Sequence, residues 1–403
     1  MRARDPFAFA VSALGITQIT AWGTSYYCLG VLAEPIAADT GWSLGLVYFG
    51  FTVGLLVMAV VSPASGRAID RRGARAVMTL GTVLVSIGLY ALSLVRSEAA
   101  YLAAWAFLGL GMRLCLYDAA FAALVQVLPS RGRLAISALT LFGAFASTVF
   151  WPLGHYLDAA LGWRETLALF SAINLAVCLP LHWYGLARRE APGHAGEQGG
   201  QAASREDPPL EGQARRVAIA LFALIMSLNG FVFGVVTVQL VPLLQGVGLG
   251  AAAAVWVASM KGFAQFGGRV VEIVFGRSLR PITVARIAVG VLPLSFVLLL
   301  AGGSSLATVV GFTLLMGASQ GVISIVRGAL PLALFGAVGY GAVLGLVATP
   351  VTLVGAASPT VFALIVERWG WRFGEVVLIA CAAASWAAIE YMVRRVGRGR
   401  RRD

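Results

Sequence analysis

The basic side chains that can do chemistry lie in apolar stretches, where an ionised group is costly. Lys261, the only lysine among 30 Lys and Arg residues, lies within VASMKGFAQFGGRVVE, and Arg113 and Arg327 lie in two other apolar stretches. Each ionised residue at such a depth costs about 2.5–3.5 kcal/mol. One acid, Asp118, is equally deep, so positive charge is in surplus. Arginine and lysine bind carboxylate and phosphate oxygens, and these cations therefore predict an anionic ligand.

Polar and aromatic residues lie near these charged residues at helical spacing. Tyr117 follows Arg113 by four residues, and Gln265 follows Lys261 by four, so each shares a helix face with its cation. Gln320 lies one heptad before Arg327, on about the same side. Candidate ligand contacts therefore also include the following residues: Gln18, Trp22, Tyr26, Asn229, Tyr117, Gln265 and Gln320.

Asp118 follows Arg113 by five residues, which on a continuous helix places it roughly 140° away. We therefore expect Asp118 to pair with another helix or to carry a coupling proton, rather than to pair with Arg113. Three structural alternatives stay open. Lys261 could pair with Asp118, Arg327 could extend to the membrane interface, and Arg113 could take an internal pair or backbone carbonyls.

The composition is that of a membrane protein. Hydrophobic residues make up 59% of the 403 residues and charged residues 12%, whereas a soluble chain carries about a quarter charged residues. The formal net charge of +12 does not point to nucleic acid, because the arginines lie between apolar runs. The four cysteines have no ligand spacing and are expected to be inert core thiols. No metal or cofactor is predicted.

Twelve apolar stretches are long enough to cross a bilayer, which takes about 20 residues. They are 8–36, 43–65, 76–95, 99–127, 134–159, 165–187, 217–245, 250–275, 282–301, 305–330, 338–366 and 373–393. The polar segment 188–216 between the two sets of six is expected to be a linker. If the N-terminus is cytoplasmic, 22 arginines lie in loops on that side and four in the opposite loops. This bias predicts two cytoplasmic termini.

The two halves repeat each other. Gly66-Arg67-Ala68-Ile69-Asp70 matches Gly268-Arg269-Val270-Val271-Glu272 at an offset of 202, and Gly162-Trp163-Arg164 matches Gly370-Trp371-Arg372 at an offset of 208. The sequence thus predicts an all-α membrane protein of twelve transmembrane helices in two six-helix bundles related by pseudo-two-fold symmetry. The predicted domains are 1–187 and 217–403, joined by 188–216.

The segment GRAIDRRGAR resembles the loop between helices 2 and 3 of the major facilitator superfamily. The matching residues are Gly66, Asp70, Arg71, Gly73 and Arg75, with a weaker copy that includes Arg269 and Glu272. The sequence departs from the pattern at Ala74, where a second basic residue is usual, and the second copy has Phe275 in place of glycine. WGTSYYCLGVLAEPIAADTGWS is also similar to the branch of oxalate/formate and monocarboxylate porters.

That resemblance implies two bundles that rock around a central site, with these loop residues in gating. Gly66 and Gly73 allow close helix approach and a sharp turn, and Asp70 can accept bonds from arginines or from a helix N-terminus. The alternative is a loop whose basic residues only set topology. With the core cations, the resemblance predicts a monomeric secondary transporter for a small organic anion in the cytoplasmic membrane, proton-coupled or exchanging.

Other classes of function fit less well. Efflux of drugs or metalloids is the alternative within the same superfamily. A P-loop needs a lysine after glycine, and Lys261 follows Met260. An intramembrane enzyme needs a nucleophile–base pair or a metal cluster, and His155, His182 and His194 are the only histidines, with no HExxH pattern. We therefore expect no enzyme activity.

Overall fold

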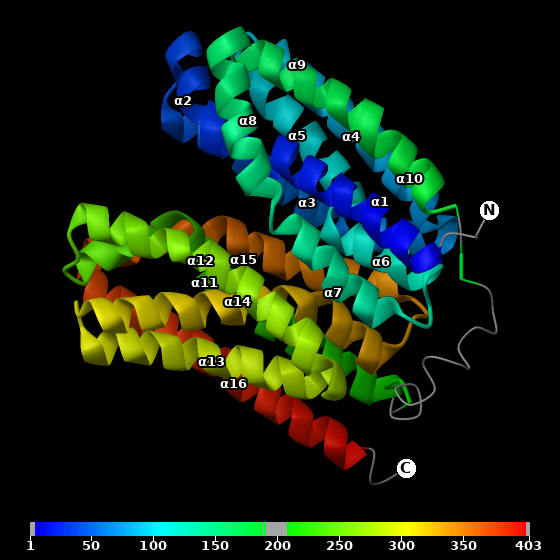
Figure 1. The fold of residues 1–403 in the computed structure, drawn as a ribbon, viewed down its shortest axis with the longest axis vertical. Coiled ribbons are helices and arrows are strands. Elements are labelled where there is room, and N and C mark those ends of the chain that lie inside the picture. The colour runs from blue at the N-terminus through cyan, green and yellow to red at the C-terminus, as the bar shows by residue number, and fades with distance from the viewer. Residues whose placement is uncertain (1–4, 188, 191–207, 400–403) are drawn as a thin grey trace. The chain divides into compact units, whose positions relative to one another are not determined.

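The computed structural model describes residues 5–187, 189–190 and 208–399, and in this part of the chain all regular structure is helical. The predicted linker 188–216 lies largely outside the described residues, as do 1–4 and 400–403. The described residues form two compact units (Figure 1). The first is Met1–Asp207 with Gly336–Thr349, and the second is Pro208–Phe335 with Pro350–Asp403.

The first unit contains six apolar spans, several of them interrupted. Its helices are α1 Pro6–Ala21, α2 Leu29–Thr40, α3 Leu44–Arg72, α4 Ala74–Ser93, α5 Glu98–Cys115, α6 Tyr117–Val127, α7 Gly132–Gly143, α8 Ala146–Leu161, α9 Trp163–Ile173 and α10 Leu179–Gly185. Single π-helical turns, Trp22–Tyr26 and Asn174–Cys178, follow α1 and α9. Such turns are frequent at functional sites.

The second unit is built from longer helices. They are α11 Gly212–Gly246, α12 Ala251–Phe275, α13 Pro281–Gly302, α14 Leu306–Phe335, α15 Tyr340–Trp369 and α16 Trp371–Gly399. The first turns of α15, up to Thr349, belong to the first unit. The second unit's core holds Phe296, Phe312 and Phe362, all fully buried.

A helix or helix pair lies at each of the twelve predicted spans, and eleven of these are apolar enough to cross a membrane. The exception is α12, which is 25 residues long. Lys261, Gln265, Arg269 and Glu272 lower its hydropathy. The least apolar of the twelve is therefore the one that carries the single lysine.

Close contact between helix backbones organises both units, and it involves corresponding pairs of helices. In the first unit α3 packs on α5, and in the second α12 packs on α14 (Figure 1). A Cβ added at Gly109 would lie 2.1 Å from the carbonyl oxygen of Gly54, and one at Gly321 would lie 2.2 Å from that of Gln265. Small residues permit such approach in membranes, where dispersion contacts drive packing.

The repeated sequence segments have the same local structure. Gly162 and Gly370, with φ of 89° and 81°, each end a helix and precede a tryptophan that begins the next one. The preceding helices both carry an internal proline, Pro152 in α8 and Pro359 in α15. The local structure is therefore duplicated along with the sequence.

Candidate functional site

Arg113 and Asp118 form a buried ion pair in the first unit, with side chains 2% and 5% exposed. The expectation that Asp118 points away from Arg113 is wrong, because the helix is not continuous there. Leu116 is extended (φ −80°, ψ −169°) and separates α5 from α6. The 140° estimate assumed unbroken helical geometry, and the break turns Asp118 back toward Arg113. The internal pair, which the sequence left open for Arg113, is the arrangement observed.

Gln18 of α1 compensates for the break in the neighbouring span. Its side-chain nitrogen donates to the Cys115 carbonyl at 2.9 Å, and its oxygen accepts from the Trp22 indole at 3.1 Å. A carbonyl near a helix end lacks its intrahelical partner and needs such a donor when it is buried. Gln18 is itself fully buried. It therefore supports the site, and its amide is already engaged.

Three half-buried aromatic residues form a cluster beside this pair, with Tyr117 adjacent to Asp118 in the sequence and Trp22 and Tyr26 contributed by the first span. The Trp22 ring lies 4.8 Å from Tyr26 and 5.1 Å from Tyr117 between ring centroids, and Tyr117 stacks on Phe121 at 5.2 Å. The π-helical turn Trp22–Tyr26 places the first two of these rings. The first unit thus brings together its predicted site residues: Gln18, Trp22, Tyr26, Arg113, Tyr117 and Asp118.

In the second unit, Lys261 lies half-buried in the middle of α12. Its Nζ is 5.4 Å from the centroid of the Phe233 ring on α11, a cation–π distance. Among the described residues of this unit, no carboxylate forms an ion pair with Lys261. One turn further along α12, Gln265 donates to Gln320 of α14 at 3.4 Å. The predicted polar face of α12 therefore exists, with an ammonium group on it.

The other predicted residues of the second unit have more varied surroundings. Asn229 is buried and donates to Ser385 Oγ at 2.6 Å, so its amide serves the packing of α11 on α16. Arg327 is half-buried on α14. Arg269 donates to Ser324 Oγ at 3.2 Å, and Glu272 is buried near the end of α12. The second copy of the loop segment is thus helical and mostly packed within the unit.

Asp70 binds the N-terminus of α15 within the first unit. Its carboxylate accepts hydrogen bonds from the backbone N–H groups of Gly341 at 3.0 Å and Ala342 at 2.7 Å. A Cβ added at Gly66 would lie 2.1 Å from the Gly341 carbonyl oxygen. Gly73, with φ of 82°, makes the turn into α4. Of the two partners expected for Asp70, the helix N-terminus is the one observed.

Two arginines of this loop are exposed, and a third is half-buried. Arg71 and Arg72 are exposed, and the Arg75 guanidinium lies 4.0 Å over the Trp183 ring of α10. We name the contact of Gly66 and Asp70 with the first turns of α15 the α3–α15 seam.

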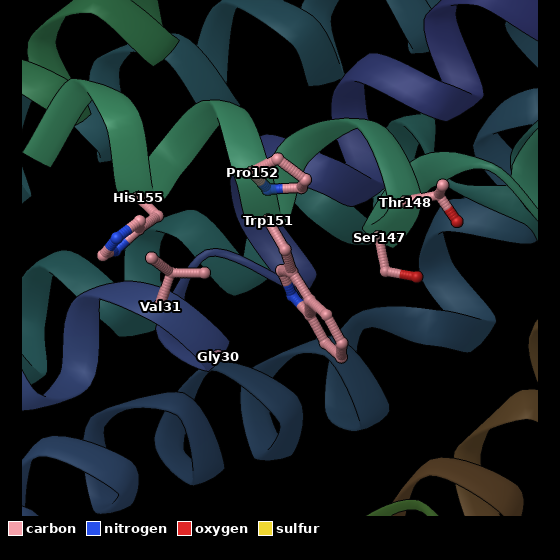
Figure 2. Close-up of a pocket in the computed structure, with 7 residues that line it drawn as sticks. All are labelled: Gly30, Val31, Ser147, Thr148, Trp151, Pro152 and His155. Carbon is pink, nitrogen blue, oxygen red and sulfur yellow. The ribbon is translucent and has the colours of Figure 1, made fainter. Parts of the chain in front are cut away.

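A cavity of about 590 Å³ between α2 and α8 was not predicted from the sequence. In Figure 2 the Trp151 and His155 side chains extend from α8 on the side where Gly30 and Val31 of α2 lie. The Trp151 indole donates to the Tyr27 carbonyl at 3.2 Å, just after the π-helical turn. Glycine at position 30 leaves room for the Trp151 ring. A glycine in one span that faces a tryptophan in another was the signal in the sequence from which this cavity could have been inferred. Ser147, Thr148 and Pro152 complete the wall.

His182 serves the packing of the first unit. Its Nδ1 lies 2.7 Å from Thr82 Oγ1, and its Nε2 lies 3.0 Å from Thr17 Oγ1. The Thr17 hydroxyl also donates to the Leu14 carbonyl and the Thr82 hydroxyl to the Met78 carbonyl, so the imidazole ring lies between two side chains that are each bonded to their own helix. Among the described residues, no three His, Cys, Asp or Glu side chains are arranged to bind a metal ion.

Arg131 joins three segments at the end of the first unit where α1 begins. Its guanidinium contacts Asp5 at 2.8 Å and Glu190 at 3.1 Å. The hydrogen bond from Arg131 lowers the pKa of Asp5 below its ordinary 3.8. For Glu190, burial alone would raise the pKa, but hydrogen bonds from Ser130 and the charge of Arg131 outweigh it and lower the pKa below 4.5.

Acid is expected to remove this contribution to stability. Both carboxyl groups have lowered pKa values in the folded state, so their contribution is complete above the unfolded values and is lost as pH falls through the folded ones. Thermal unfolding of the wild type and of Arg131→Gln, followed from pH 7 to pH 3, should show a difference in Tm that shrinks below about pH 4.5. A difference that stays constant over this range would contradict the assignment. Arg96→Gln, in an exposed loop of the same unit, serves as the control.

The comparisons with known proteins agree with this architecture. The model of the Major Facilitator Superfamily matches residues 14–312. Human monocarboxylate transporter 11 is 28% identical over 286 residues, which cover 66% of this chain and 54% of that protein. Multidrug resistance protein MdtL of Escherichia coli is 28% identical over 172 residues, 42% of this chain and 43% of MdtL. The chain thus spans about half the length of these relatives.

Solved structures share the fold over almost the whole chain. The human organic anion transporter MFSD10 superposes with a TM-score of 0.72 at 17% identity, covering 96% of this chain and 100% of that one. FucP in its outward conformation gives 0.71 at 14% identity, covering 96% and 99%. At these identities the likeness concerns the fold alone. With three quarters of its length matched by the family model, the chain belongs to the Major Facilitator Superfamily, whose members are membrane transporters of small-molecule solutes and not enzymes.

Proposed function

We propose that this transporter carries a small organic anion, of the monocarboxylate kind, across the cytoplasmic membrane by alternating access. The observation that carries the proposal is Lys261, a half-buried ammonium group in the middle of a helix, with no carboxylate paired to it among the described residues of its unit. A buried charge of this kind is costly unless it is paired. A carboxylate solute would supply the missing negative charge.

The charges of the first unit support an anion over a cation. An exporter of cationic drugs would need an acid free to face its solute, and Asp118, the mid-span acid, is paired with Arg113. This pair contributes no net negative charge. The curated relatives include both a monocarboxylate transporter and a multidrug resistance protein. Efflux of drugs or metalloids therefore remains the second candidate, favoured by the MdtL match.

Coupling to protons is proposed to run through the same pair. Arginine can donate to a carboxylate through two nitrogens, and in this structure Arg113 donates to Asp118 through Nη1. A solute carboxylate that takes the place of Asp118 on Arg113 would separate the buried Asp118 carboxylate from the Arg113 guanidinium. Protonation then becomes favourable, because burial disfavours the charged form of an acid. Anion and proton would thus be taken up together.

The α3–α15 seam is proposed to close one side of the transporter. Asp70 caps two N–H groups at the start of α15, where the helix dipole favours negative charge. The arginine-rich loops, including the one that contains Asp70, are proposed to be cytoplasmic, as are both termini. Closure at Gly66 and Asp70 would then seal the cytoplasmic side. Arg71, Gly73 and Arg75 shape the same loop.

The proposal is tested by ligand-induced thermal stabilisation of the purified protein. The panel contains short monocarboxylates, dicarboxylates, aromatic acids, phosphate esters, arsenicals and cationic dyes. One anion class should raise Tm, and Lys261→Met should weaken its apparent affinity about tenfold to a hundredfold, because a hydrogen bond to a charged group contributes about 1.5–3 kcal/mol. Lys261→Arg should retain part of the effect. Ser259→Ala, on an exposed part of the same helix, is the matched control.

A second readout uses the fact that Lys261 is the only lysine. An amine-reactive reagent can modify only this side chain and the terminal amine, and peptide mapping separates the two. The stabilising anion should protect Lys261 and leave the terminus unprotected. If neutral or cationic compounds stabilise the protein equally in wild type and Lys261→Met, the anion proposal is wrong and efflux of another solute class becomes the better explanation.

A further inference from the structure

A second cavity, of about 420 Å³, lies beside the loop between α3 and α4. It is lined only by residues of the first unit: Asp70, Arg71, Arg72, Gly73, Gln126 and Arg189. Its volume falls in the range of small-molecule sites, about 300–1,000 Å³. Three of its six lining residues are arginines, which come from two segments far apart in the sequence.

The other polar side chains of this cavity are already engaged. The two carboxylate oxygens of Asp70 accept from Gly341 N–H and Ala342 N–H. The Gln126 oxygen accepts from Ala74 N–H at 2.9 Å, and its nitrogen donates to the Ile69 carbonyl at 3.0 Å. The guanidinium groups are therefore the donors that remain for a ligand. Arginine recognises phosphate oxygens bidentately, so the chemistry of this cavity suits a phosphate group.

Aromatic residues next to the cavity place it at the membrane surface. Trp183 and Tyr184, near the end of α10, are 46% and 65% exposed. Exposed tryptophan and tyrosine at a helix end are typical of the interface between lipid and water. The Arg75 guanidinium, just after the loop, stacks 4.0 Å over the Trp183 ring. The arginine cavity and the interfacial aromatic residues therefore lie at the same end of this unit.

We infer that this cavity binds the glycerophosphate headgroup of an anionic phospholipid of the cytoplasmic leaflet. Basic cavities on the cytoplasmic side of transmembrane helices are suited to such headgroups. The leaflet assignment rests on the proposed orientation, whereas headgroup binding itself depends on neither the orientation nor the transported solute. Arg72 and Arg189 supply the phosphate contacts. The lipid chains extend along the face of α10 that exposes Trp183.

The experiment measures lipid binding to the detergent-purified, full-length protein. Phosphatidylglycerol is titrated against phosphatidylcholine of the same chain length, and bound lipid is counted by native mass spectrometry, with Tm as a second readout. The wild type should bind phosphatidylglycerol preferentially. Arg72→Gln/Arg189→Gln should lose about thirtyfold in apparent affinity, given about fivefold for each arginine near an anionic lipid surface. Arg67→Gln, which removes an exposed charge on α3 outside the cavity, should change it less than about twofold.

Titration with soluble phosphates distinguishes a site for a phospholipid headgroup from a site for a free phosphate compound. Inorganic phosphate and glycerol phosphate are titrated in the same assay, and neither should match phosphatidylglycerol at equal concentration. If either matches it and the double variant abolishes the effect, the cavity is a soluble-phosphate site and the lipid inference is overturned. It is also overturned if Arg67→Gln weakens phosphatidylglycerol binding as much as the double variant does, since the effect would then be general surface charge. Solute-induced stabilisation, measured in parallel, reports separately on the proposed transport function.

Discussion

Replacing Asp118 by alanine is expected to destabilise the protein by about 3–5 kcal/mol, because it leaves the Arg113 guanidinium charged and buried without its carboxylate. Thermal or denaturant unfolding of the purified protein in detergent measures this loss. Arg113→Met/Asp118→Leu removes both charges and should be more stable than Asp118→Ala, since apolar replacements of a buried pair are often tolerated. Glu98→Ala, which removes an exposed acid at the start of α5, should change stability far less.

A conservative variant separates this stability role from proton coupling. Asp118→Asn keeps the shape of the side chain but has no carboxylate to protonate. In proteoliposomes it should lose uptake driven by a pH gradient while retaining exchange of solute for solute. Uptake driven by the pH gradient at wild-type rates would show that Asp118 carries no coupling proton. An Asp118→Ala variant as stable as the wild type would contradict the burial argument itself.

Replacing Gly66 by alanine is expected to prevent closure of the α3–α15 seam. The added Cβ would lie 2.1 Å from the Gly341 carbonyl oxygen, and a backbone atom cannot move aside as a flexible side chain can. Overpacking of this kind costs about 1–3 kcal/mol, which shifts the balance away from the closed form by roughly fivefold to more than a hundredfold. Transport should fall by a comparable factor.

The same substitution elsewhere on α3 provides the control. A Cβ at Gly45 would meet nothing closer than Ser43 Oγ at 3.8 Å, so Gly45→Ala should transport normally. Asp70→Asn should weaken the seam in a different way, because a neutral amide oxygen is a poorer partner for the helix N-terminus than a carboxylate. Normal transport by both Gly66→Ala and Asp70→Asn would exclude the seam from the transport cycle.

The features that the sequence predicted correctly depend on local pattern. The positions of the spans follow from apolar runs of sufficient length, and the duplicated Gly-Trp helix starts follow from short segments repeated at a fixed offset. The close approach at Gly66 was also predictable, since only glycine lets two backbones come so near. Whether the loop acts as a gate stays a prediction.

The features that were missed depend on where a helix breaks and on contacts between distant segments. The residues directly around Leu116 include neither glycine nor proline to mark the interruption. That break alone turns the Asp118 side chain toward Arg113 instead of away from it. The contacts of Arg131 with Asp5 and Glu190 span 126 and 59 residues. Without a second sequence to reveal paired positions, no local pattern indicates such contacts.

Helix α15 is continuous from Tyr340 to Trp369, yet its first turns belong to one unit and the rest to the other. The division falls at Pro350, which lacks the N–H group that would bond to the preceding turn. Amide hydrogen exchange in residues 341–349 should therefore follow the state of the seam, while exchange beyond Pro350 follows the second unit. The rate of amide exchange along this one helix should therefore change at Pro350, and the rate in residues 341–349 would report how often the seam opens.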